Sequence, residues 1–237
     1  MSVAAGARPG RRAITDPRRA PTVPADPRWQ PVPAERHTLA ALRQRFSHPP
    51  HWSPEYIDDR FRLDDTPPKP AAVLLPLIAR EGAPTVLLTV RAAHLTAHAG
   101  QVAFPGGRID PGDASAADAA LREAYEEVGL PRAAVELLGP LPPYLTGTGY
   151  AVTPVVGWVD APPAYVHDPI EVAEIFEVPL AYLLDPAHHQ HRLWRWDDGA
   201  ERQFLAMPWT RPADGREFFI WGVTAAILRN FYRFLAA

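Results

Sequence analysis

A cluster of three glutamates inside one helical segment constrains this chain more than any other feature. Residues 122–130 read Arg-Glu-Ala-Tyr-Glu-Glu-Val-Gly-Leu. At about 100° per residue, Glu123, Glu126 and Glu127 fall on one narrow face of a helix. The opposite face is expected to pack on the core through Leu121, Ala124, Tyr125 and Val128. Carboxylates about 4 Å apart repel by roughly 4 kcal/mol at an effective dielectric constant near 20.

Two explanations account for such a cluster. An ordinary surface helix can carry a solvated acidic face. Alternatively, a divalent cation turns the repulsion into attraction, and hard carboxylate oxygens on one rigid element suit Mg²⁺ or Mn²⁺. The residues that flank the helix favour the second explanation.

A glycine loop precedes the helix, and clear signals mark both helix ends. Residues 100–108 read Gly-Gln-Val-Ala-Phe-Pro-Gly-Gly-Arg, a short apolar run that breaks into two adjacent glycines. Asp113 or Ser115 can cap the start of the helix, and Gly129 stands where a left-handed C-terminal cap belongs. The sequence therefore predicts a strand, a glycine loop that lets the backbone approach a bound group closely, and a capped helix.

This unit resembles the Nudix box, which is Gly, five residues, Glu, seven residues, then Arg-Glu-aliphatic-any-Glu-Glu-any-Gly-aliphatic. Residues 122–130 match the second half of the pattern. The first half departs from it, because the residue that follows Gly107 at the required spacing is Asp113 rather than Glu. One additional residue also separates Asp113 from Arg122, so the role of the first acidic position is open.

Further strings are similar to the coenzyme A pyrophosphatase branch of the Nudix hydrolases. They lie at 87–91, 100–107, 149–157, 171–180 and 219–227. The resemblance implies hydrolysis of the diphosphate bond of coenzyme A or its derivatives, with Mg²⁺ or Mn²⁺ as cofactor. The products would be 3′,5′-adenosine diphosphate and 4′-phosphopantetheine. One alternative is a Nudix pyrophosphatase for another nucleoside diphosphate derivative, such as ADP-ribose or NADH, and a second is a ligand-sensing Nudix domain without catalysis.

The resemblance also implies roles for individual residues. Glu123 and Glu127 are the expected metal ligands, with Glu126 as a further ligand or a residue that positions water. Arg122 is expected to hold a glutamate through a bidentate salt bridge. Glu171 is the predicted general base, and Glu174 is its competitor.

Candidates for contacts with the substrate surround the glycine loop. The substrate-binding residues are predicted to be Arg91, Gln101, Gly106, Gly107 and Arg108. An aromatic slot for adenine could use Phe104, Tyr144 or Tyr150. Histidines are expected to serve structure or solvent rather than metal: His98 as a structural residue, and His188, His189 and His191 as a solvated loop.

Composition excludes several other classes of protein. The absence of cysteine excludes a disulfide framework, a thiolate metal site and a cysteine nucleophile. A formal net charge of −3 gives no reason to expect nucleic acid as a partner. No apolar run approaches the roughly 18 residues that a membrane span needs. A cytoplasmic enzyme with a small-molecule substrate is expected, and the sequence leaves its oligomeric state open.

Two regions are predicted along the chain. Residues 1–35 are rich in Pro, Arg and Ala and are expected to form a disordered tail. Residues 36–237 are expected to form the Nudix hydrolase domain. Strands are predicted at 71–79, 84–91, 134–140 and 152–159, a strand running into a helix at 173–182, and a hairpin around 197–199. With helices at 39–46 and in the acidic segment, and an amphipathic helix at 224–235, the fold class is α/β, an α/β/α sandwich with a mixed sheet.

Overall fold

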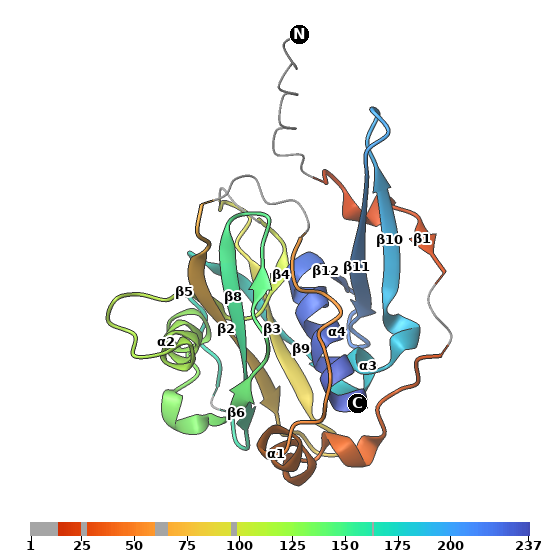
Figure 1. Ribbon diagram of the computed structural model, residues 1–237. Coiled ribbons are helices and arrows are strands. Elements are labelled where there is room, and N and C mark those ends of the chain that lie inside the picture. The colour runs from red at the N-terminus through yellow and green to blue at the C-terminus, as the bar shows by residue number, and fades with distance from the viewer. Residues whose placement is uncertain (1–13, 25–27, 60–65, 96–98, 163) are drawn as a thin grey trace.

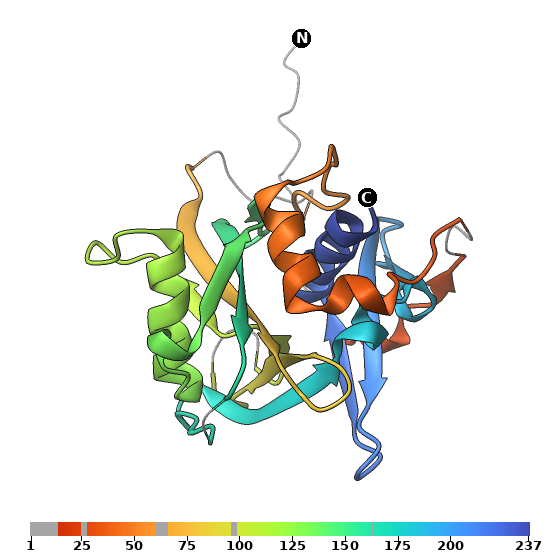
Figure 2. The ribbon, with the colours of Figure 1, turned by 90° about the horizontal axis from the view of Figure 1, so that it is seen from below.

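The computed structural model describes residues 14–24, 28–59, 66–95, 99–162 and 164–237. An eight-stranded mixed sheet forms the centre of the fold. Helix α2 (Ala116–Val128) covers one face of this sheet, and helix α4 (Gly222–Ala236) lies on the other side (Figures 1 and 2). The predicted α/β/α sandwich with a mixed sheet is therefore confirmed. A four-stranded antiparallel sheet packs beyond α4 and adds a further layer.

The larger sheet is built around one long parallel pair of strands. Strand β2 (Lys69–Ile78) runs parallel to β8 (Tyr150–Val159), and β3 (Thr85–Arg91) pairs antiparallel with the end of β2. The other members are β4 (Val102–Ala103), β5 (Gly106–Arg108), β6 (Glu136–Pro140), β7 (Tyr144–Leu145) and β9 (Val172–Pro179). Strand β5 pairs antiparallel with the start of β2, so the end of the glycine loop becomes part of the sheet.

Strand β2 is apolar from Pro70 to Ile78 because the sheet is covered on both faces. Leu74 and Ile78 pack against α2, whereas Leu75 and Leu77 belong to the core on the α4 side. Both sets have no exposed surface. The same alternation of side chains in β3 and β9 decides which polar residues reach α2.

The smaller sheet has the order β1-β10-β11-β12. Its strands are β1 (Thr22–Val23), β10 (Gln190–Arg195), β11 (Glu201–Thr210) and β12 (Glu217–Trp221). Strands β10 and β11 form the hairpin predicted around 197–199.

The prediction of a disordered tail over 1–35 is wrong for its described part, 14–24 and 28–35. Strand β1 pairs with β10, and Ala20 and Val32 are 3% and 5% exposed. These few apolar residues are enough because they enter cores formed by distant parts of the chain. Residues 1–13 and 25–27 lie outside the described residues.

Helix α4, predicted to be an amphipathic helix, is buried on its polar side as well as on its apolar side. Eleven of its 15 residues are buried, including Arg229 and Asn230. Its apolar residues share one core with side chains of both sheets, such as Leu75 and Met207. A helix between two sheets buries its polar side as well, so those polar residues need internal partners.

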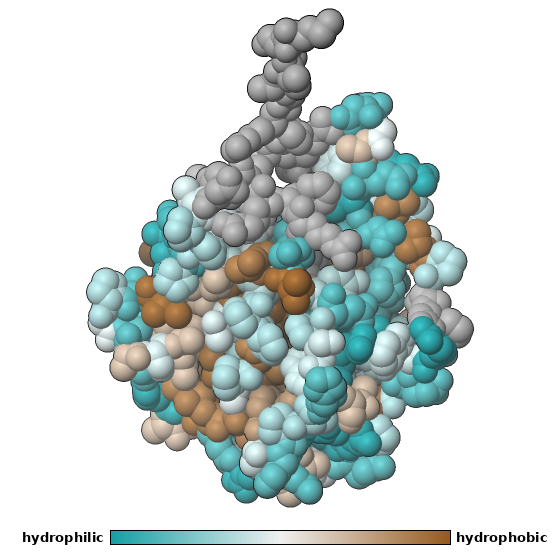
Figure 3. Space-filling model, in the orientation of Figure 1, coloured by the Kyte–Doolittle hydropathy of each residue, from teal (hydrophilic) through white to brown (hydrophobic). Residues whose placement is uncertain are grey.

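The remaining α-helices are α1 (Leu39–Ser47) and α3 (Leu180–Leu183). Hydrophilic side chains cover most of the β10–β11 side of the surface, and apolar surface gathers over the region of β6 and β8 (Figure 3). Leu137 of β6 is 41% exposed there.

Among the described residues, every helix is too short or too polar to cross a membrane.

Candidate functional site

Helix α2 begins and ends as its sequence predicts. The Ser115 side chain accepts a hydrogen bond from the Asp118 amide at 3.1 Å, and its hydroxyl donates to the Asp118 carboxylate at 3.0 Å. Gly129 ends the helix in the left-handed region with φ 69°. A Cβ atom there would also lie 3.0 Å from the carbonyl oxygen of Val166, so glycine lets the loop before β9 lie on the helix end.

The glutamates of α2 differ in their environments. The side chain of Glu126 is 55% exposed, that of Glu123 is 16% exposed, and residue Glu127 is only 4% exposed. Tyr125, predicted to face the core, is 61% exposed instead. The buried stripe consists of Ala119, Ala120, Leu121, Ala124 and Val128, and Glu127 lies at its border. The carboxylates therefore extend from solvent to the edge of the core.

The glycine loop packs directly on two of these carboxylates. A Cβ atom added to Gly107 would come within 3.0 Å of the Glu123 carboxylate. The backbone N–H of Gly106 donates to Oε2 of Glu127 at 3.4 Å. Close approach to the acidic helix therefore requires glycine at position 107, whereas a Cβ atom at Gly106 would come within 3.0 Å of the carbonyl oxygen of Ala72 in β2.

Burial and mutual repulsion disfavour ionisation of these two glutamates. Burial raises the pKa of Glu127 to about 8, and the charges of Glu123 and Glu171 act in the same direction. Arg91 and the Gly106 amide oppose the shift. Burial likewise raises the pKa of Glu123, against the effect of Arg122. A buried carboxylate next to others is costly without a cation.

Arg122 organises the acidic cluster from the outside. Its bidentate partner is Asp113, through Nε at 3.0 Å and Nη2 at 2.9 Å. Its Nη1 donates to both Glu123 and Glu126 at 3.0 Å. The prediction of a bidentate bond to a glutamate is therefore wrong in detail. Although the first half of the motif contains one additional residue, its acidic residue, Asp113, still contacts Arg122.

The two candidates for the general base lie on opposite faces of the sheet. Glu171 precedes β9, and its charge acts on both Glu123 and Glu127. Glu174 forms ion pairs with Arg211, at 2.8 Å, and with Arg216. Side chains alternate along β9, so Glu174 faces the α4 side with Phe176. Glu171 is the candidate that the fold brings to the acidic helix.

The loop that carries Glu171 is attached to the end of α2. The amides of Val166 and Asp168 donate to the carbonyls of Val128 and Glu127, at 3.3 and 3.1 Å. The Asp168 carbonyl accepts from the Glu171 amide at 3.1 Å. Asp168 was not singled out from the sequence, where only the position of Pro169 behind it signals a turn.

The predicted substrate-binding residues divide between two sides of the glycine loop. Arg91 lies near Glu127, since its charge lowers that carboxyl's pKa. The guanidinium of Arg108 instead contacts the Tyr150 hydroxyl, at 3.1 Å from Nε and 2.9 Å from Nη2. Gln101 lies across from Arg91, and the backbone amide of Arg91 donates to the backbone carbonyl of Gln101 at 3.0 Å.

Of the three aromatic residues proposed for an adenine slot, two belong to the core. Phe104 and Tyr144 are both 4% exposed, and the Tyr144 hydroxyl donates to Asp59 at 2.6 Å. Tyr150 is partly exposed, with the Arg108 guanidinium 5.7 Å from its ring centre.

The histidine cluster is not a solvated loop. His189 is 2% exposed, its Nε2 bonds the Leu183 carbonyl at 2.8 Å, and its Nδ1 lies 3.0 Å from Nη1 of Arg229. It is therefore a structural residue and one of the internal partners of α4. His98 lies outside the described residues. Within the part of the chain that the structure describes, no three histidine or acidic side chains converge on a metal position.

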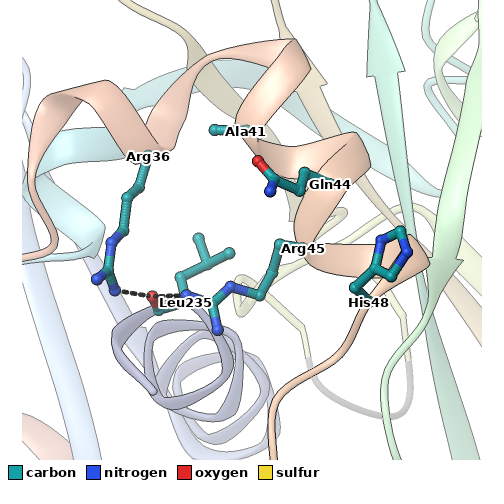
Figure 4. Close-up of a pocket in the computed structure, with 6 residues that line it drawn as sticks. All are labelled: Arg36, Ala41, Gln44, Arg45, His48 and Leu235. Carbon is teal, nitrogen blue, oxygen red and sulfur yellow. Dashed lines mark hydrogen bonds between the residues drawn. The ribbon is translucent and has the colours of Figure 1, made fainter.

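A cavity of about 270 Å³ lies at the C-terminal end of α4, and the arginines that line it already have partners. Arg36 donates to the Leu235 carbonyl at 2.9 Å, and Arg45 to the carbonyls of Ala237 and Leu235 at 3.1 and 3.3 Å (Figure 4). Both arginines satisfy the last carbonyls of the helix.

Comparisons with known proteins identify the family of this chain. The model of the NUDIX domain matches residues 67–210. The uncharacterized Nudix hydrolase NudL of Escherichia coli strain K12 is 47% identical over 161 residues, which cover 68% of this chain and 79% of that protein. NudL of Shigella boydii serotype 18 gives the same values.

Among solved structures, the Nudix hydrolase RenU of M. smegmatis is 29% identical, covers 47% of this chain and 71% of its own, and has a TM-score of 0.41. A MutT/nudix family protein from Enterococcus faecalis is 17% identical, covers 83% of this chain and 74% of its own, and has a TM-score of 0.43. By the family model and the identity to NudL, the chain belongs to the Nudix hydrolase family and is a pyrophosphohydrolase.

Proposed function

We propose that this enzyme hydrolyses the diphosphate bond of coenzyme A or its derivatives, with Mg²⁺ or Mn²⁺ bound by Glu123 and Glu127. The products are 3′,5′-adenosine diphosphate and 4′-phosphopantetheine. The observation that carries the proposal is the burial of Glu127 under the glycine loop, beside Glu123 and Arg91. This arrangement combines carboxylates for a cation with backbone and guanidinium groups for a diphosphate.

The residues present fit a divalent cation. Glu123 and Glu127 offer hard oxygen donors one helical turn apart, and Gly107 leaves their surroundings free of a side chain. Arg122 fixes Glu123 and Glu126 from the solvent side. When bound, the ion neutralises negative charge on the diphosphate and polarises the attacking water.

Glu171 is proposed to accept the proton of the attacking water. The water oxygen forms a bond to one phosphorus, its proton passes to the Glu171 carboxylate, and the bridging P–O bond breaks. The leaving phosphate carries away the electron pair of that bond. Arg91 stabilises charge on the phosphate oxygens from the β3 side of the cluster.

The choice of coenzyme A rests on the strings that resemble its pyrophosphatases. These include residues 100–107 of the glycine loop and 219–227 at the start of α4. Tyr150 and Arg108 together offer a partly exposed ring and a guanidinium plane for the adenine nucleotide. Stacking of this kind stabilises a bound base without specifying the rest of the substrate.

The test is hydrolysis of a panel of coenzyme A, ADP-ribose, NADH and a diadenosine polyphosphate, with Mg²⁺, Mn²⁺ or chelator, read by mass spectrometry. The proposal requires metal-dependent formation of both expected products from coenzyme A, at the highest kcat/KM of the panel. A higher kcat/KM for ADP-ribose or NADH would move the substrate to another nucleoside diphosphate derivative. Glu127→Gln should lower the activity by several orders of magnitude, because it removes a metal ligand.

A further inference from the structure

A tight turn at Asp168 joins two residues on which the proposed mechanism depends, Glu127 on α2 and Glu171 before β9. The backbone amide of Asp168 donates to the Glu127 carbonyl at 3.1 Å. The Asp168 carbonyl accepts from the Glu171 amide at 3.1 Å and from the Val172 amide at 2.8 Å. One residue therefore connects the backbone of a proposed metal ligand to the backbone of the proposed base.

The Asp168 side chain holds this turn in shape. Its Oδ1 accepts a hydrogen bond from the Ile170 amide at 2.8 Å, which is the geometry of an Asx turn. Pro169 lies between the two residues, and its ring fixes φ and disfavours helical backbone for the residue before it. Ile170 is 65% exposed, so packing on the core does little to hold this part of the chain. The shape of the turn therefore depends on the aspartate.

The pairing of β9 does not fix Glu171 alone. One additional residue of β9, Ala173, lies between the partners of Val90 and Arg91 in β3, and such a bulge changes the direction of the side chains next to it. Beyond the bulge, the Glu171 carbonyl accepts from the Ala92 amide at 2.9 Å, and Glu171 is exposed. The direction of this carboxylate therefore depends also on the turn before it.

The chain that leads into the turn is anchored by separate contacts. The Tyr165 hydroxyl donates to the Glu177 carboxylate of β9 at 3.1 Å. The Val166 amide donates to the Val128 carbonyl at the end of α2, at 3.3 Å. These contacts fix where the chain approaches the helix, and the Asx turn then determines its course over the last residues before the proposed base.

The same local turn also occurs away from the acidic helix. Oδ1 of Asp16 accepts from the Arg18 amide at 3.1 Å, and Oδ1 of Asp185 accepts from the Ala187 amide at 2.9 Å. A proline follows each of these aspartates, as it follows Asp168. The turn is thus a general way to shape the backbone, and its meaning at Asp168 comes from the residue that it leads to.

We propose that Asp168 is a positioning residue for Glu171, and that it acts through the geometry of its turn rather than through its charge. The inference rests on the proposed function, in which Glu171 accepts the proton of the attacking water. A general base must lie within about 2.6–3.2 Å of the group that it deprotonates. A displacement of about 1 Å can lower a rate about 10²-fold. A loosened turn leaves the Glu171 carboxylate chemically intact and displaces it from the water.

Three substitutions of Asp168 separate geometry from charge. Asp168→Asn keeps the acceptor of the turn and removes the charge, Asp168→Glu keeps the charge and displaces the acceptor, and Asp168→Ala removes both. The kcat for coenzyme A should stay within about threefold of wild type in Asp168→Asn and fall about 10- to 100-fold in the other two, with KM unchanged within about twofold. Asp185→Ala is the matched control, because it removes the same bond beyond the opposite end of β9 and should keep the wild-type kcat.

A double-mutant cycle tests whether the effect passes through Glu171. In the Glu171→Gln background, Asp168→Ala should lower kcat by less than about twofold, because the carboxylate to be positioned is already absent. Hydrogen exchange of the Glu171 amide, followed by NMR, provides a readout that needs no turnover. Protection of this amide should decrease in Asp168→Ala and Asp168→Glu and stay unchanged in Asp168→Asn, at similar melting temperatures. If Asp168→Ala folds poorly, Asp168→Glu takes its place in the cycle.

The outcomes separate this inference from the proposed function. A loss of kcat in Glu171→Gln, together with wild-type kcat in Asp168→Ala and Asp168→Glu, would overturn the positioning role and leave the proposed function standing. A full further loss in the double variant, or lower activity in Asp168→Asn than in Asp168→Glu, would also overturn the role. Wild-type kcat in Glu171→Gln would overturn the proposed base and the role together. If the wild type prefers another member of the substrate panel, coenzyme A is excluded as the substrate, and the same cycle on the preferred member decides the role of Asp168.

Discussion

Replacing Glu127 by glutamine should stabilise the metal-free protein while it removes activity. Glu127 is 4% exposed, and burial raises its pKa to about 8. In the unfolded chain its pKa returns to the ordinary value of 4.5. At neutral pH folding therefore has to protonate this carboxylate, whereas glutamine is neutral in both states and can still accept the Gly106 hydrogen bond.

The magnitude follows from the two pKa values. Between pH 4.5 and 8 the folded metal-free protein holds a proton that the unfolded chain has lost, so stability falls as the pH rises through this window. The penalty reaches about 3 kcal/mol at pH 7 and about 1 kcal/mol at pH 5, at 1.36 kcal/mol per pKa unit. The glutamine variant should escape most of it.

The assay is urea unfolding of wild type and Glu127→Gln with chelator at pH 5, 6, 7 and 8. Titrating groups that do not interact with Glu127, His189 included, cancel in the difference between the two proteins. Glu126→Gln is the matched control, because its side chain is 55% exposed and should leave stability nearly unchanged. Equal stability of Glu127→Gln and wild type at pH 7, or a difference that does not grow from pH 5 to pH 7, would refute the reasoning.

Four further predictions concern the metal, the base, the loop and the histidine. Millimolar Mg²⁺ should raise the melting temperature of wild type, by an amount equivalent to about 2.7 kcal/mol at 100 times Kd, and should not raise that of Glu127→Gln; differential scanning calorimetry measures this. Glu171→Gln should lower kcat about 10²- to 10⁴-fold and remove the acidic limb of the pH–rate profile. Glu174→Gln, which loses ion pairs to Arg211 and Arg216, should keep kcat within a few fold. A larger loss of kcat in Glu174→Gln than in Glu171→Gln would assign the base to Glu174. Gly107→Ala should lower kcat in a folded enzyme, because its Cβ would come within 3.0 Å of the Glu123 carboxylate, and Gly112→Ala, which has open space, is the control for steady-state kinetics. Burial lowers the pKa of His189 to about 4, so on acidification the unfolded chain takes up a proton before the folded protein does. Up to about 3 kcal/mol of stability should therefore be lost as the pH falls from 6.5 to 4. An NMR titration in which the His189 imidazole protonates above pH 6 would contradict this.

The sequence by itself determined the local parts of the proposed site. The Ser115 cap, the Gly129 stop and the spacing of Glu123 and Glu127 depend on residues within one helix, and the periodicity of a helix fixes their relative positions. The apolar strands on either side of the glycine loop were likewise predictable, because their residue types suit a sheet buried on both faces.

Tertiary structure decided how these parts are used. The buried state of Glu127 and the exposed position of Tyr125 depend on which sheet face meets α2, and so does the position of Glu171, rather than Glu174, near that helix. Ordering of residues 14–24 and burial of α4 on both sides depend on a second sheet, of which the sequence predicted only one hairpin. Such contacts join residues far apart in the chain, and local periodicity carries no information about which distant surfaces will pack together.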